Sequence, residues 1–285
     1  MDPLLQSGSK TDIGKIRDNN EDSFYINDKF GIYIVADGIG GYKGGEIASK
    51  IATEYLGERI SEKLRDSNFS DINSNKFLQN EENTILEIIK SLILETNYKI
   101  IKESLQKNLY NMGTTIVLAI CFNNFFYLVN IGDSRGYIWS NKEKRLKQLT
   151  EDDSLVNDMV KLGKISVEES RDHRLKNVIT KYLGSPDSSK PIIKKINWTS
   201  KDMLILCSDG LTNMLEDKEI ESVIYQNTES KFDTQALKNG KTRNRPQEIS
   251  NALVDLSNQS GGYDNITSVV IENKVNSSNT ILMDK

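Results

Sequence analysis

Short apolar runs alternate along the chain with longer segments in which apolar residues recur at helical spacing. The runs SFYIND from Ser23 and GIYIVADG from Gly31 are rich in β-branched and aromatic residues and too short for helices. The polar pair Asp28-Lys29 separates them, so they predict two paired strands. Further strands are expected at GTTIVLAICF from Gly113, FFYLVNIGD from Phe125, GYIWS from Gly136, KPIIKKINW from Lys190, DMLILCSDG from Asp202 and NITSVVIEN from Asn265.

Helices are expected between these strands. An amphipathic helix follows Gly44-Gly45, because Ile47, Ile51 and Tyr55 recur at nearly helical spacing. Three more are expected at about 83–106, 217–226 and 246–257. The mixed, charged stretch at about 154–182 suits a surface flap, and the Asn-, Ser- and Lys-rich stretches at about 66–83 and 228–245 suit loop insertions. We expect one domain over 1–274 and a frayed tail over 275–285.

Charge and composition narrow the classes of function. Lys and Arg number 37 against 41 Asp and Glu, a net charge of −4, which gives no electrostatic reason to expect nucleic acid or anionic lipid as a partner. Cys121 and Cys207 each lie inside an apolar run and are expected in the core, as in a reducing cytosol. The N-terminus has no apolar signal region, and no apolar run approaches the length that spans a bilayer. A cytoplasmic protein with no membrane partner is expected.

Several acidic residues stand where buried strands are expected to begin or end. A single Asp of this kind is ordinarily a turn residue or a helix cap. Their repetition suggests instead that strand ends converge, and crowded carboxylates need a cation or protons to persist. Oxygen ligands select hard ions such as Mg²⁺ or Mn²⁺. The residues are Asp37, Asp133 and Asp209 after apolar runs, and Glu21-Asp22 and Asp264 before them.

Other residues limit the chemistry of such a site. His173 is the sole histidine and both cysteines are expected in the core, so a tetrahedral zinc site is excluded. Arg17, four residues before Glu21, could clamp a phosphate with two parallel donors. The stretch DGIGGYKGG from Asp37 is neither a Walker A loop nor a dinucleotide fingerprint, and we interpret it as a turn that lets backbone and a helix start approach the ions.

Six motifs in order, RDNNEDSF, VADGIGG, MGTTIVLA, NIGDSR, LCSDGL and GGYDNIT, closely resemble those of the metal-dependent protein phosphatases of the protein phosphatase 2C type, in particular the compact bacterial members. The resemblance covers about residues 8–273. It implies an α+β fold, a four-layer αββα sandwich of two antiparallel sheets flanked by helices. It also implies two Mn²⁺ or Mg²⁺ ions in the active site, with a third, weaker ion in bacterial members.

The resemblance implies a role for each matched residue. Asp37 would bridge the two ions, the Gly38 carbonyl would bind one of them, and Asp209 and Asp264 the other. Glu21 would bind metal directly or through water.

The remaining matched residues would act around these ligands. Asp22 would hold metal-bound waters, and Asp133 would help Asp209 to hold the third ion. Arg17 would bind the substrate phosphate, and Asn265 would orient Asp264 by hydrogen bonding.

The implied reaction is direct hydrolysis of phosphoserine and phosphothreonine by a metal-bridging water, with no phosphoenzyme. Phosphorylated proteins, a cognate kinase and a monomeric state are expected. Ile39, Tyr42 and Asp153 stand where relatives often carry His, so the acid that protonates the leaving group stays open. His173, in the flap, could touch substrate, although an ordinary surface role is the simpler interpretation.

Two other classes of function fit the sequence less well. A pseudophosphatase would bind a phosphoprotein without turnover, but every expected metal carboxylate is present. A nuclease would need a basic track for nucleic acid, which this chain lacks.

Overall fold

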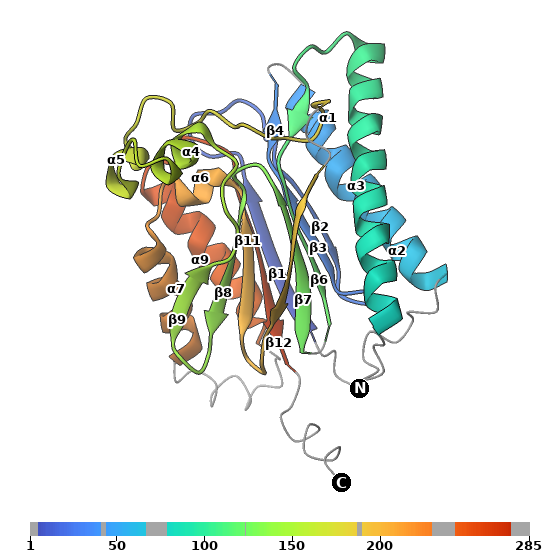
Figure 1. The fold of residues 1–285 in the computed structure, drawn as a ribbon. Coiled ribbons are helices and arrows are strands. Elements are labelled where there is room, and N and C mark those ends of the chain that lie inside the picture. Colours follow the sequence, from blue (N-terminus) through green and yellow to red (C-terminus); the bar gives the residue numbers. More distant parts are fainter. Residues whose placement is uncertain are drawn as a thin grey trace.

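The computed structural model describes residues 5–40, 44–66, 79–122, 124–186, 190–229 and 243–274. Over these residues two five-stranded antiparallel sheets pack face to face, and helices cover their outer faces (Figure 1). The first sheet has the order β1 (Leu5–Asp12), β12 (Ile266–Asn273), β11 (Met203–Cys207), β8 (Arg135–Ser140) and β9 (Arg145–Gln148). The second has the order β10 (Ile192–Asn197), β7 (Phe125–Ile131), β6 (Ile116–Cys121), β3 (Ile32–Ala36) and β2 (Ser23–Asn27).

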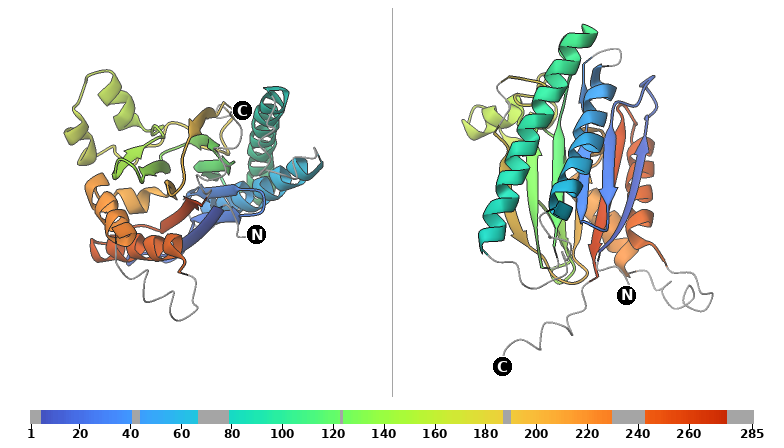
Figure 2. Two further views of the ribbon diagram at one scale, coloured as in Figure 1. Left: turned by 90° about the horizontal axis from the view of Figure 1, so that it is seen from below. Right: turned by 90° about the vertical axis from the view of Figure 1, so that its right-hand side faces the viewer.

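The helices form the two outer layers, as Figure 2 shows from two further sides. The second sheet is covered by α1 (Gly44–Lys50), the π-helical turn η2 (Ile51–Tyr55), α2 (Leu56–Asp66) and α3 (Gln79–Lys107). The first sheet is covered by α6 (Asp209–Thr212), α7 (Asp217–Glu229) and α9 (Arg245–Gln259). A small sheet of β4 (Gly38–Ile39) and β5 (Gly113–Thr114) and the short helices α4 (Leu155–Lys161) and α5 (Val167–Arg171) lie at one end. The expected αββα sandwich is confirmed.

Burial on both faces explains why the central strands are continuous apolar runs rather than alternating ones. All five residues of β3 are buried. Ile32 and Ile34 join the core under α1, α2 and α3, whereas Tyr33 and Val35 point into the core between the sheets. Successive side chains of a strand point to opposite faces, so each inner strand supplies two cores at once.

The sequence expectations differ from the structure in several elements. Strands β1 and β9 were not predicted, and α3 begins at Gln79, inside the stretch expected to be a loop insertion. Likewise, α7 extends to Glu229. Most of both expected insertions, at 67–78 and 230–242, lies outside the described residues, as does the tail over 275–285. Among the described helices, none combines the length and apolarity needed to cross a bilayer.

Candidate metal centre

The strand register brings the acid-bearing strand ends to one end of the sandwich. Ala36, at the end of β3, pairs with Ser23, at the start of β2. In the other sheet, Cys207 near the end of β11 pairs with Ser268 near the start of β12. Since Asp37 follows β3, Glu21-Asp22 precede β2, Asp209 follows β11 and Asp264 precedes β12, these acids share that end.

Asp37 and Asp209 lie close enough for their charges to interact, although the two residues follow strands of different sheets. The buried Oδ1 of Asp209 has no hydrogen-bond partner among the described residues. Burial raises the pKa of Asp37 well above its usual value, and the negative charges of Asp22, Asp209 and Asp133 raise it further. Asn213 donates to the second oxygen of Asp209 over 3.0 Å. The carboxyl groups of Asp37 and Asp209 therefore resist ionisation unless a cation binds to them.

Asp22 and Asp133 each keep an unpartnered oxygen. The Oδ1 atoms of both are buried and have no hydrogen-bond partner among the described residues, while the other Asp22 oxygen accepts from Ser208 over 2.7 Å. Burial raises the pKa of Asp22 to about 7, and the charges of Asp209 and Asp264 add to that rise. A buried carboxylate oxygen without a partner is costly. The oxygen donors of this site therefore fit Mg²⁺ or Mn²⁺, which take oxygen ligands.

The carboxylates do not stand as a finished ligand set. Among the described residues, no three His, Cys, Asp or Glu side chains are grouped closely enough to hold one ion. Asp264 is turned to Arg17, whose Nη2 donates to its Oδ2 over 2.7 Å. The structure thus brings Arg17 and Asp264 together as an ion pair, whereas the sequence led us to expect that Arg17 binds phosphate and Asp264 binds metal.

Close backbone packing places Glu21 beside Gly38. A Cβ atom on Gly38 would lie 2.4 Å from the Gly45 backbone, and one on Gly45 would lie 2.4 Å from Oε2 of Glu21. A side chain does not fit at these two positions without a backbone shift, which explains the first and last glycines of DGIGGYKGG. Asn265 joins the neighbouring loops, because its Oδ1 accepts from the Glu21 backbone N–H and its own N–H donates to Asp264. The side-chain amide nitrogen of Asn265 donates to the carbonyls of Ile13 and Asn19, so this side chain ties the loops beside Asp264 together.

His173 lies in the flap, the segment of residues 154–182. It is half-buried there, and its Nδ1 accepts from the backbone N–H of Leu175 over 3.2 Å. Ile39 lies in β4, whereas Tyr42 is outside the described residues. This hydrogen bond of His173 stays within the flap and involves none of the acids.

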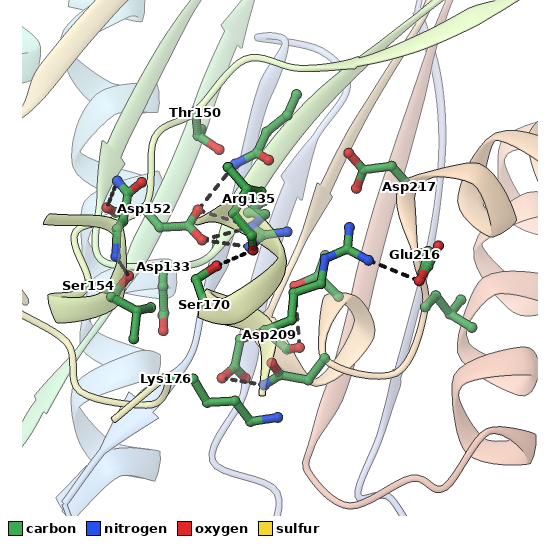
Figure 3. Close-up of a pocket in the computed structure, with 18 of the residues that line it drawn as sticks. Asp133, Arg135, Thr150, Asp152, Ser154, Ser170, Lys176, Asp209, Glu216 and Asp217 are labelled. Carbon is green, nitrogen blue, oxygen red and sulfur yellow. Dashed lines mark hydrogen bonds and ion pairs between the residues drawn. The ribbon is translucent and has the colours of Figure 1, made fainter. Parts of the chain in front are cut away.

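A hollow of about 1060 Å³ opens from the acids to the flap. Asp133 and Asp209 line it together with flap residues, and Lys176 of the flap lies near Asp209 (Figure 3). Arg171 of the flap pairs with Glu216 over 3.0 Å on the side of α7. Of the candidate metal-binding acids, Asp133 and Asp209 are the two that line this hollow.

Sequence reasoning missed the charged network behind Asp133. The half-buried Arg135 donates to Asp152 through Nε and Nη2, and its Nη1 donates to Tyr137 over 3.2 Å (Figure 3). The Tyr137 hydroxyl in turn donates to Asp217 at the start of α7. The motif NIGDSR contained Arg135, but the residues that it contacts lie far along the chain and carry no pattern of their own.

Comparison with known proteins bears on this site. The family model of protein phosphatase 2C matches residues 16–256. The chain is 34% identical over 266 residues to the serine/threonine phosphatase Stp of Listeria innocua, covering 92% of this chain and 94% of that protein. It is 33% identical to the protein phosphatase PhpP of Streptococcus pneumoniae, with the same coverage of both chains.

Solved structures agree with these relatives. The catalytic domain of the serine/threonine protein phosphatase PstP, in complex with two manganese ions, superposes with a TM-score of 0.71 at 27% identity. The match covers 94% of this chain and 97% of that domain. The order of the six motifs, the sandwich fold and the family match agree, and the chain belongs to the protein phosphatase 2C family.

Proposed function

We propose that this protein is a metal-dependent serine/threonine protein phosphatase that hydrolyses phosphoserine and phosphothreonine by direct attack of water. The convergence of buried, partly unpartnered carboxylates at one end of the sandwich carries the proposal. Divalent ions bound there would acidify a water molecule and neutralise the charge of the phosphate. Two Mn²⁺ or Mg²⁺ ions and a weaker third would be held by Glu21, Asp37, the Gly38 carbonyl, Asp133, Asp209 and Asp264.

Arg17 is the proposed phosphate-binding residue. Its side chain is 56% exposed, so the guanidinium can leave Asp264 and offer two parallel donors to a phosphate. Pairing with Asp264 meanwhile keeps it at the edge of the site. His173 is proposed as a further substrate contact, from its place in the flap.

Asp22 orients water in this proposal. Its carboxylate is held by Ser208, whose Oγ also accepts from the backbone N–H of Thr267 over 3.0 Å. One oxygen thus stays fixed while the other is available to a water molecule. The side chains Cys121 and Cys207 lie in the strand cores, so no thiolate nucleophile competes with water at this site.

We propose that residues 1–274 form one catalytic domain and that the enzyme acts as a monomer in the cytoplasm. Free, buried cysteines suit a reducing compartment. Its partners would be phosphorylated proteins and a serine/threonine kinase whose action it reverses.

The test uses purified protein, a phosphothreonine peptide and a small aryl phosphate, each with and without Mn²⁺. Phosphate release that depends on Mn²⁺ is expected, with the peptide preferred. If no metal-dependent release occurs at any pH between about 6 and 9, a pH range that spans the ordinary activation of metal-bound water, the protein is a binding member of the family rather than an enzyme.

A further inference from the structure

The two ends of the flap meet beside the candidate metal centre. The backbone N–H of Leu155 donates to the carbonyl of Val178 over 2.8 Å, and Ser154 and Ile179 form an antiparallel bridge. In Figure 1 the flap lies above α6, and the chain that leaves it crosses the same end of the sandwich towards β4. Anything that fixes the flap's two ends therefore acts close to the acids.

Asp153, directly before the flap, holds the turn that carries Asp133. Its Oδ2 accepts from the backbone N–H of Gly132 over 3.1 Å, and its own N–H donates to the Gly132 carbonyl over 2.9 Å. Gly132 has a φ of +104°, and a Cβ there would lie 2.7 Å from Thr115. The backbone of this turn therefore has few allowed conformations, and Asp153 fixes the position of the turn relative to the flap.

Lys181, near the other end of the flap, contacts the same Asp153. Its Nζ pairs with the remaining oxygen, Oδ1, of Asp153. Two residues later, Leu183 and Thr114 exchange both backbone hydrogen bonds, of 2.8 and 2.9 Å, and the Thr114 hydroxyl donates to the Asp37 carbonyl over 2.8 Å. The pair thus connects the segment that holds Asp37 with the turn that holds Asp133.

An ordinary surface ion pair is the competing explanation, and such pairs contribute little to stability. The exposures argue against it. The Asp153 side chain is 10% exposed and both its oxygens are engaged, whereas that of Lys181 is 49% exposed. Lys181 can therefore be replaced with little loss of folding stability. The Asp153 carboxylate contacts both Lys181 and Gly132, so a change at Lys181 can shift Gly132.

We propose that the Lys181–Asp153 pair is a positioning element that sets how tightly Asp133 and Asp209 hold an ion. The inference rests on the proposed function, in which Asp133 is an ion ligand. Neither partner of the pair touches substrate, and both act through the Gly132–Asp133 turn. Asp153 occupies a position at which relatives often carry His. Here the negative charge of Asp153 is balanced by Lys181, near the other end of the flap.

The test compares Lys181→Met and Asp153→Asn with a matched control. Lys181→Met keeps the stem without the charge, and Asp153→Asn keeps an acceptor for Gly132. The control, Lys161→Met, breaks a pair with Glu151 whose side chains are 49% and 47% exposed, also at the flap. Calorimetric titration of metal-free protein with Mn²⁺ is the direct readout, and the Mn²⁺ dependence of hydrolysis is the second.

In both test variants the Mn²⁺ affinity of the weakest site should fall about tenfold, because each variant loses a group that orients a metal ligand. The Mn²⁺ concentration for half-maximal activity should rise by the same factor. The KM for phosphopeptide at saturating Mn²⁺ should stay unchanged, Lys181→Arg should restore binding, and Lys161→Met should behave as the unaltered protein. Unchanged Mn²⁺ binding in a folded Lys181→Met protein, or an equal loss in Lys161→Met, would overturn the proposal.

Thermal unfolding of each variant separates misfolding from weakened binding. If Asp153→Asn fails to fold, the result for Lys181→Met alone tests the proposal. This variant should fold, because the Lys181 side chain is half exposed. Should the unaltered protein bind Mn²⁺ without hydrolysing phosphopeptide, the proposed function fails, whereas the binding comparison still decides the role of the pair.

Discussion

Asp209 has a buried Oδ1 with no hydrogen-bond partner among the described residues, so its charge is one that a bound divalent ion would balance directly. Asp209→Asn removes that charge with almost no change in shape. We expect kcat to fall by about three orders of magnitude, equivalent to about 4 kcal/mol at 1.36 kcal/mol per tenfold. The measurement is turnover of a phosphothreonine peptide at saturating Mn²⁺, with the melting temperature as a check on folding. Normal turnover would remove Asp209 from the metal site.

Arg17 should show a different kinetic signature. Because the guanidinium is proposed to bind phosphate in the ground state, Arg17→Ala should raise KM about tenfold with a smaller change in kcat, as expected for losing a charged hydrogen bond. Steady-state kinetics on one phosphopeptide measure both. Arg59→Ala, which breaks a surface pair with Glu62 on α2, is the control and should leave both constants unchanged. A fall in kcat at constant KM would contradict a phosphate-binding role.

At this scale the sequence singled out the expected ligand-type residues, whose roles stay a prediction, but it did not reveal the partners of those residues. Asp37 and Asp209 were recognisable because each ends a buried apolar run, which is an unusual place for a charge. Arg135 and Asp153 are held by contacts with residues 17 and 28 positions away, and nothing local marks such contacts. The pairing of Arg17 with Asp264 spans 247 positions and was equally invisible.

Strand β1 shows why some elements escaped prediction. Leu5 is its only large apolar residue, and the strand lies at the edge of its sheet, where polar residues are tolerated. Strand β9 is likewise an edge strand with one apolar residue, Leu146. In contrast, the inner strands are buried on both faces, and their composition reveals them. The edge strands β2 and β10 were predicted because they contain several β-branched or aromatic residues, so it is the edge strands poor in such residues that escape prediction.

The contact between β1 and α9 yields a test of that fold. A Cβ on Gly8 would lie 2.1 Å from the backbone nitrogen of Gln247, so Gly8→Ala must push the helix off the strand. We expect a loss of about 1–3 kcal/mol of unfolding free energy, the usual cost of overpacking. Urea unfolding measures it. Gly44→Ala, which meets Met112 at an ordinary 3.4 Å, should cost less, and equal losses would refute this helix-on-strand contact.

At the scale of the molecule, the meeting of the acids depends on register, which sequence spacing alone does not set. The segment of Asp133 is joined to that of Asp37 through the Thr115 hydroxyl. This hydroxyl accepts from the Asp37 backbone N–H and shares a hydrogen bond of 2.7 Å with the Ser134 hydroxyl. The repetition of acids at strand ends suggested this convergence, and the resemblance to the family implied which acids would share the ions. The flap contacts and the 1060 Å³ hollow had no sequence signal.

Crowding of buried acids also predicts how stability depends on pH. Burial raises the pKa of Asp37 and Asp133 well above the usual value, and that of Asp22 to about 7. The metal-free folded state therefore binds more protons than the unfolded state between about pH 4, the usual Asp value, and the raised pKa values. Its unfolding free energy should fall as pH rises through that window, and the stabilisation by Mn²⁺ should grow.

Urea unfolding at several pH values from about 5 to 8, with EDTA and with Mn²⁺, measures both trends across the window set by the raised pKa values. Asp22→Asn cannot ionise, so its metal-free profile should be flatter than that of the unaltered protein. A Glu82→Gln variant is the control, because the pKa of Glu82 is lowered by its surface pair with Lys195 and removing it should leave the downward slope in place. Metal-free protein that is as stable at the alkaline end as at the acidic end would show that these carboxyls ionise freely, and the case for a cation-dependent site would lose its electrostatic basis.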